Sequence, residues 1–171
     1  MRRAMAVLIA LSTVFALGVG AAQAQSQTLA GDKYGGSFGD IRKIVVNNAT
    51  NALTTKVFGI GRPCKEAKSL QVNVTNRLGR LLFMAEAGCY GASTWGTGLY
   101  STTTGKPEDA TEVTCGKFVF ARSPKTGAYR IVIPRKCMAG APNKLRVEVD
   151  GLNFGSASGG HAGPTKALRR G

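Results

Sequence analysis

The chain alternates apolar and polar residues over short windows. In residues 69–76, single polar residues separate Leu70, Val72 and Val74, and residues 144–150 alternate in the same way. A period of two places successive side chains on opposite faces of a β-strand. Both windows therefore predict strands with one face in a hydrophobic core and the other toward solvent.

The other apolar windows have the length and composition of strands. Short turn sequences such as "RLGR" and "SPKTG" separate several neighbouring windows, which is typical of antiparallel hairpins. No window has a sustained helical period with capping residues. The pattern predicts an all-β protein, an antiparallel β-sandwich of about seven to nine strands that is immunoglobulin-like or jelly-roll-like. The seven clearest windows are residues 40–48, 52–61, 69–76, 81–87, 114–122, 128–136 and 144–150.

Composition divides the rest of the chain around this sandwich domain, which is expected over residues 40–150. Residues 25–39 are polar and Gly-rich and predict a flexible leader, and residues 151–171 predict a Gly-rich basic tail.

The first 24 residues have the features of a secretory signal peptide. Arg2 and Arg3 precede an uncharged apolar run over residues 5–20, and "AQA" at 22–24 supplies small residues before a cleavage point after Ala24. The alternative is an uncleaved anchor, but the run is shorter than the about 20 residues that a spanning helix needs. We therefore expect a secreted protein with no transmembrane segment after cleavage.

Four cysteines, Cys64, Cys89, Cys115 and Cys137, follow the signal peptide. An even number in an exported chain indicates two disulfides, with three connectivities open. If the hairpin that turns at "SPKTG" is centred near residue 126, Cys115 and Cys137 lie opposite each other. The hairpin that turns at "RLGR" leaves Cys64 and Cys89 near its open ends. We predict a disulfide-bridged sandwich with the pairs Cys64–Cys89 and Cys115–Cys137, and no zinc site because no CxxC spacing occurs.

The chain is strongly basic. Its net charge is +14, which becomes +12 without Arg2 and Arg3 of the signal peptide. Such a charge favours anionic partners such as acidic glycans and cell-envelope polyanions. The cations are scattered singly or in pairs rather than in dense runs, so a generally basic exterior is favoured over a dedicated polyanion or nucleic-acid site.

Catalytic constellations are missing from the sequence. His161 is the only histidine and lies in "SASGGHAG", where we interpret it as a mobile, solvated side chain. Glu86 is interpreted as a strand residue facing solvent, and Glu108, Asp109 and Glu112 as a solvated acidic loop. Because nucleophilic and acid–base catalysis need paired groups, we expect no enzyme activity, no cofactor and no metal.

Three aromatic residues lie in or next to a Gly-, Ser- and Thr-rich stretch, residues 89–105. Tyr90, Trp95 and Tyr100 can form a platform on which a sugar stacks, with neighbouring hydroxyls as its rim. The alternative for Trp95 is core packing against a disulfide, as in immunoglobulin-like domains. The sequence leaves both interpretations open and slightly favours packing.

Three segments resemble a group of small secreted actinobacterial proteins of uncharacterised function. They are "DIRKIVVNNATNALTTKV" (40–57), "RIVIPRKCMAGAPNKLRVEV" (130–149) and "GPTKALRRG" (163–171). The resemblance implies a β-sandwich reminiscent of carbohydrate-binding modules and a structural Cys115–Cys137 bridge. It implies no catalytic residue.

The leading hypothesis is a secreted, non-enzymatic module that binds a glycan or another cell-envelope polymer, with Tyr90, Trp95 and Tyr100 as the ligand-binding residues. The alternative is a secreted protein-interaction module such as a protease inhibitor. Its contact loop would be residues 61–68 or 122–127.

Overall fold

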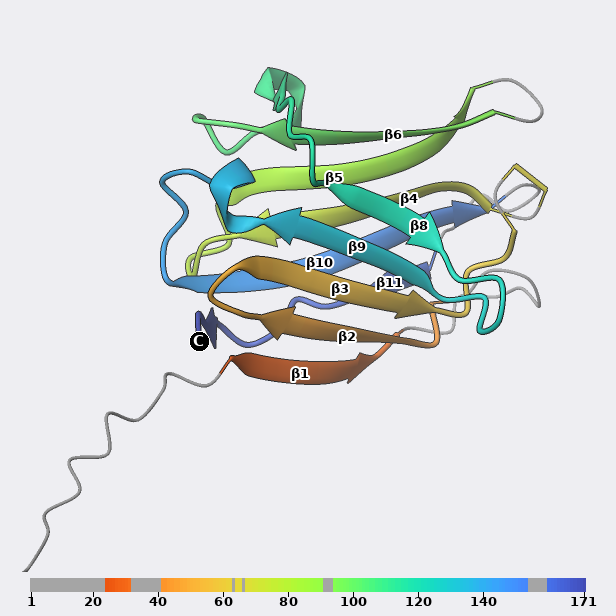
Figure 1. Cartoon of the computed structure of the whole chain (residues 1–171), viewed down its shortest axis with the longest axis horizontal. Helices are drawn as coiled ribbons and strands as arrows, with labels where there is room; N and C mark the ends of the chain where they lie inside the picture. Colours follow the sequence, from red (N-terminus) through yellow and green to blue (C-terminus); the bar gives the residue numbers. More distant parts are fainter. Residues whose placement is uncertain (1–23, 32–40, 63, 66, 91–93, 154–159) are drawn as a thin grey trace, which may run out of the picture.

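The computed structural model describes residues 24–31, 41–62, 64–65, 67–90, 94–153 and 160–171, so residues 1–23 of the predicted signal peptide and residues 32–39 of the predicted leader lie outside the described residues. The chain folds into two antiparallel sheets (Figure 1). One sheet has five strands in the order β1-β2-β3-β9-β8. The other has seven and runs β11-β10-β4-β5-β6-β7, with β12 also paired to β10. The strands are β1 (Gln25–Ala30), β2 (Lys43–Asn48), β3 (Ala52–Phe58), β4 (Ala67–Thr75), β5 (Leu81–Tyr90), β6 (Thr94–Ser101), β7 (Thr111–Glu112), β8 (Val119–Arg122), β9 (Tyr129–Pro134), β10 (Lys144–Asn153), β11 (Gly160–Ala162) and β12 (Leu168–Arg169), and the 3-10 helices are η1 (Pro107–Asp109) and η2 (Arg135–Cys137).

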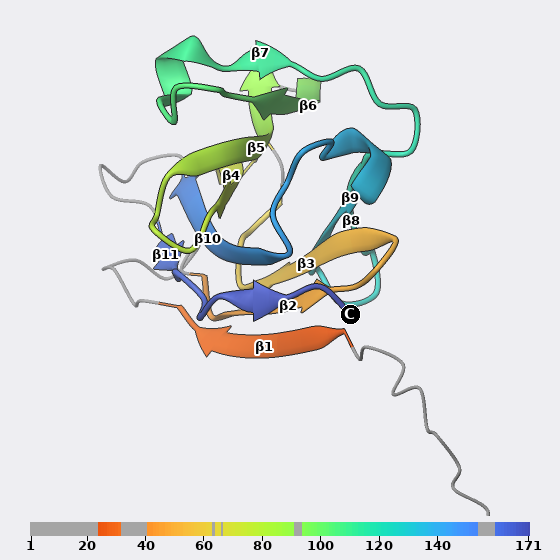
Figure 2. The same ribbon diagram turned by 90° about the vertical axis from the view of Figure 1, so that its left-hand side faces the viewer.

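The hydrophobic core lies between the two sheets, as the alternating pattern predicts. Inward-facing residues of β2, β3 and β9 meet those of β4, β5 and β10. Figure 2 looks onto one end of this two-layer arrangement. The antiparallel β-sandwich is thus confirmed, but the described residues form 12 strands rather than the expected seven to nine, because short strands at the sheet edges carry little apolar pattern. The largest fully buried side chains include Tyr129, Ile41, Ile44, Leu53, Leu70, Leu99, Ile131, Ile133 and Leu145.

The predicted hairpins are present. Strand β2 pairs with β3, β4 with β5, and β8 with β9, each across a short turn. The two strictly alternating windows become β4 and β10, which are direct neighbours with Val72 opposite Val149. Their apolar faces therefore join in one continuous layer, while their polar faces form part of the sheet's outer surface.

Both predicted disulfides are present. Cys64 is bonded to Cys89 and Cys115 to Cys137, with Cα–Cα distances of 5.5 and 5.9 Å. Each bond closes a loop of more than 20 residues, and the chain-entropy model assigns such a loop about 3 kcal/mol of stabilisation.

The predicted leader and tail both contribute strands, which corrects the domain boundaries. Residues 25–30 form β1, which extends the five-stranded sheet beside β2. In the tail, β10 continues to Asn153, and β11 and β12 pair with it. Leu168 is buried, and its carbonyl accepts a hydrogen bond from Asn48 Nδ2 at 2.7 Å. Sequence reasoning missed these pairings because the small residues around them carry little apolar pattern.

Within the described ranges, no helix has the length and apolar character needed to cross a membrane.

Candidate functional site

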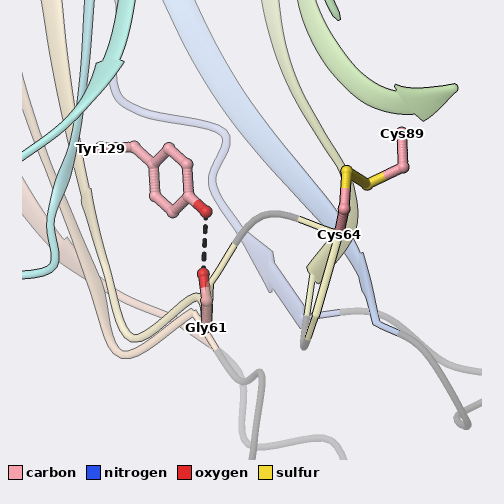
Figure 3. The surroundings of a disulfide bond; sticks show 4 residues. All are labelled: Gly61, Cys64, Cys89 and Tyr129. Atoms are coloured by element: carbon pink, nitrogen blue, oxygen red, sulfur yellow. Dashed lines mark hydrogen bonds between the residues drawn. A yellow bond between two sulfur atoms is a disulfide. The ribbon is translucent and has the colours of Figure 1, made fainter. Parts of the chain in front are cut away.

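Trp95 is directed toward the core of the sandwich. It lies on β6 opposite Cys89, is half-buried, and its ring centroid is 6.0 Å from that of Tyr129. Tyr129 is fully buried, and its hydroxyl donates a hydrogen bond to the Gly61 carbonyl at 2.8 Å (Figure 3). Trp95 therefore packs beside the Cys64–Cys89 bridge, as the packing alternative describes.

Tyr100 lies on the other face of the same strand. Side chains alternate along β6, so Tyr100 is on the outer surface of the seven-stranded sheet. Its ring covers Gly98, where an added Cβ would come within 2.7 Å of the ring. The Tyr90 backbone pairs with Thr94, and its side chain lies outside the described residues. Trp95 and Tyr100 thus do not share one platform.

The chain connections at the end of the sandwich that Figure 2 faces enclose a cationic groove. We call it the basic groove. It is open, has a volume of about 750 Å³, and is formed by the β2–β3, β4–β5 and β9–β10 connections and the last residues of the chain. Its four cations are all exposed. The groove is lined by Thr50, Arg77, Pro142, Asn143, Lys144, Arg169, Arg170 and Gly171.

Local hydrogen bonds hold these segments in place. Asn76 Oδ1 accepts bonds from the backbone N–H groups of Leu78 and Arg80 at 2.9 and 3.0 Å, which fixes the turn that carries Arg77. Gly79 in this turn has a φ of +86°, a conformation that favours glycine. The end of the chain is held to the β9–β10 connection, because the backbone N–H of Arg170 donates to the Asn143 carbonyl at 2.7 Å.

Arg135 adds a further positive charge beside the groove. Its Nε donates to the Ala49 carbonyl at 3.2 Å, and its Nη2 donates to Asn48 Oδ1. Burial, together with the nearby charge of Arg170, lowers the pKa of Arg135. The Nη1 atom of Arg135 is buried without a hydrogen-bond partner among the described residues. These cations come from separate segments around residues 77, 135–144 and 169–170, so the sequence showed only a scattered distribution of positive charge.

A second pocket lies on the outer surface of the seven-stranded sheet. We call it the acidic pocket. It has a volume of about 300 Å³ and opens between β11, β10, β4 and β5. Lys144 is the first residue of β10 and Asp150 lies six residues further along the strand, about 20 Å away at the rise of an extended strand. The two sites are therefore separate. The pocket is lined by Ser69, Gln71, Glu86, Asp150, Gly151, Gly160 and His161.

His161 is held in place in this pocket, which corrects its interpretation as a mobile side chain. It lies on β11 directly opposite Asp150, and its Nδ1 is 2.8 Å from Asp150 Oδ1. Its Nε2 is 3.2 Å from the Gly163 carbonyl oxygen and 3.5 Å from Glu148 Oε1. The hydrogen bond to Asp150 and the two negative charges raise the pKa of His161, against the opposing effect of burial. Sequence reasoning missed the pairing because the register between β10 and β11 is a tertiary feature.

The other acidic residues and the two contact loops named from the sequence lie at separate places in the fold. Glu86 is half-buried on β5 and lines the acidic pocket. Glu108, Asp109 and Glu112 are exposed near η1 and β7. Of the two loops suggested for protein contacts, residues 122–127 comprise the end of β8 and the β8–β9 turn, whose residues 124–126 are exposed, while 61–68 lies partly outside the described residues.

Comparisons with known protein families and with curated proteins find no match to this chain.

Proposed function

We propose that this protein is a secreted, non-enzymatic module that binds an anionic carbohydrate or another anionic polymer of the cell envelope, and that it binds this polymer in the basic groove. One observation carries the proposal: four cationic side chains line the groove, and no described lining residue has an acidic side chain.

The chemistry of the groove suits an extended anion. Arg77, Arg169 and Arg170 carry planar guanidinium groups, which bind phosphate, sulfate and carboxylate through two parallel hydrogen bonds. Like charges gathered at one place repel one another, and a polymer with regularly spaced anions neutralises several of them at once. The open shape favours a chain that passes through the groove over a small enclosed ligand.

The groove also has uncharged polar groups that suit a sugar. Asn143 offers a carboxamide, which both donates and accepts hydrogen bonds and so matches hydroxyl groups. Two disulfides fit an extracellular location, where such polymers occur. The resemblance to a sandwich of the carbohydrate-binding type supports the same class of ligand.

The test compares binding to immobilised dextran sulfate and neutral dextran, using protein purified without an affinity tag. We expect binding to the sulfated polymer alone. The fourfold variant R77Q/K144Q/R169Q/R170Q should bind about 10- to 100-fold more weakly, the sum of several modest surface charge contacts.

The matched control K43Q/K56Q/K125Q/R130Q removes the same charge. Lys43, Lys56 and Arg130 are exposed on the outer surface of the five-stranded sheet, and Lys125 is exposed in the β8–β9 turn. The affinity of this variant for dextran sulfate should fall less than about threefold, because only the long-range effect of net charge is reduced. Equal losses in both variants would refute the groove as the site. Duplex DNA that binds as tightly as dextran sulfate would refute the preference for carbohydrate.

A further inference from the structure

We propose that His161, Asp150 and Glu148 form a binding site for one divalent transition-metal ion, Zn²⁺ or Cu²⁺. The structure brings one ligand atom from each of the three side chains within 4.8 Å of the others. This site lies at the acidic pocket and does not depend on polymer binding in the basic groove.

Two adjacent strands fix the three side chains. Glu148 and Asp150 are two residues apart on β10, so both side chains lie on its outer face. His161 lies on β11 opposite Asp150. The imidazole is therefore placed between the two carboxylates, with Asp150 at Nδ1 and Glu148 on the side of Nε2. An imidazole offers one nitrogen to an ion, so an ion at Nε2 would take Glu148 as its carboxylate ligand while Asp150 at Nδ1 orients the ring.

Gly163 brings a further oxygen, that of its carbonyl group, to the Nε2 side of His161. It has a φ of +124°, and a Cβ there would lie 2.8 Å from the Val147 carbonyl oxygen and 2.9 Å from the Glu148 Cα. Only glycine lets the backbone come this close to β10. The close approach leaves the Gly163 carbonyl oxygen 3.2 Å from His161 Nε2, on the side that faces Glu148.

The donor set identifies the class of metal. An imidazole nitrogen with carboxylate oxygens suits Zn²⁺ and Cu²⁺, whereas Ca²⁺ takes six to eight oxygens and Mg²⁺ an octahedron of oxygens. The imidazole distinguishes this group from the exposed carboxylates of Glu108 and Asp109, which have no histidine beside them.

The surroundings provide support and access. Asn73 Nδ2 donates to Asp150 Oδ2 at 3.0 Å, which orients the carboxylate and leaves Oδ1 toward His161. Hydrogen bonds of this kind to the ligands strengthen metal sites. The acidic pocket reaches Asp150 and His161 from solvent, so an ion can enter and keep water in its open positions.

The local charge favours a cation. Glu86, Glu148 and Asp150 place three carboxylates on one face of a chain whose net charge is +14. Arg146 precedes Glu148 on the same face but forms no ion pair with it among the described residues. A bound divalent ion would offset this concentration of negative charge.

The test is calorimetric titration of tag-free, chelator-treated protein with Zn²⁺ and with Cu²⁺ at about pH 8, well above the ordinary imidazole pKa of about 6.5. We expect one equivalent of either ion to bind, and no binding of Ca²⁺ or Mg²⁺. H161A should weaken binding at least about tenfold, and N73A about tenfold, at the lower end of the losses at supporting positions. The control E108Q/D109N should bind as the unaltered protein does.

A second measurement reports directly on the His161 side chain. His161 is the only histidine, so its ring signals in an NMR spectrum are unambiguous. They should shift with Zn²⁺ and broaden with Cu²⁺. E148Q, at a side chain about one-third exposed, replaces H161A if the latter fails to fold.

No binding at about millimolar metal, unchanged affinity in H161A or E148Q, or ring signals that do not respond would each overturn the proposal. Dextran sulfate binding is to be measured with a chelator present, so that its failure and the failure of the metal site are distinguishable.

Discussion

Strand β10 links two clusters of opposite charge, the basic groove near Lys144 and the acidic pocket near Asp150. In the pocket, opposite charges meet on neighbouring strands, and a proton on His161 can compensate the carboxylates within the protein. In the groove, like charges meet at the ends of separate connections, and Arg170 acts on Arg135 without an intervening acid among the lining residues. The pocket therefore pairs part of its negative charge with His161 inside the protein, whereas every charged side chain that lines the groove is positive.

The largest effect should follow from placing an acid in the groove. R170E replaces a repulsive neighbour of Arg135 with an attractive one, so the protein should keep or gain stability. Its affinity for dextran sulfate should fall about 10- to 100-fold, while Zn²⁺ binding at the distant pocket stays unchanged. Surface-immobilised dextran sulfate and calorimetry measure the two affinities. K125E, at the exposed β8–β9 turn, is the control, and an equal loss in that variant would contradict the contrast between the regions.

An intermediate effect is expected at Trp95, which belongs to neither charged cluster. W95A removes a half-buried ring from its contact with Tyr129, so the free energy of unfolding should fall by about 2 kcal/mol, less than for a fully buried aromatic. Urea denaturation measures this change, and W95F should recover much of it. Affinity for dextran sulfate should be unchanged. A stable W95A protein with lost polymer binding would instead support the aromatic platform.

The smallest effect concerns the pH dependence of the acidic pocket without metal. The raised pKa of His161 means that the folded state holds its proton more tightly than the unfolded chain. The resulting stabilisation is fully present below the unfolded pKa of about 6.5 and disappears as pH rises through the higher folded value. Since the ring is about one-third exposed, we expect only a few tenths of a kcal/mol.

The measurement is the difference in unfolding free energy between the unaltered protein and H161Q, in chelator, at several pH values. Subtracting H161Q removes the contributions of other titrating groups. A difference that grows with rising pH would contradict the sign derived from the hydrogen bond to Asp150.

The strands and disulfides were predictable because their signals are local. Leu70, Val72 and Val74 carry a period of two, and turn residues place Cys115 near Cys137 across one hairpin. By contrast, β1 and β12 are short edge strands whose pairing depends on partners elsewhere in the chain. Their own residues show no strong pattern, so composition suggested a leader and a tail.

The sequence by itself determined the all-β architecture, the two bridges and the excess of positive charge, because periodicity, cysteine spacing and composition need no knowledge of neighbours. Only the tertiary structure decided where the charges gather. Arg77 and Arg170 meet because separate connections end at the same side of the sandwich, and His161 meets Asp150 because of the β10–β11 register. It also decided that Trp95 packs toward Tyr129 while Tyr100 lies on the opposite face, since one strand presents alternate residues to two different environments.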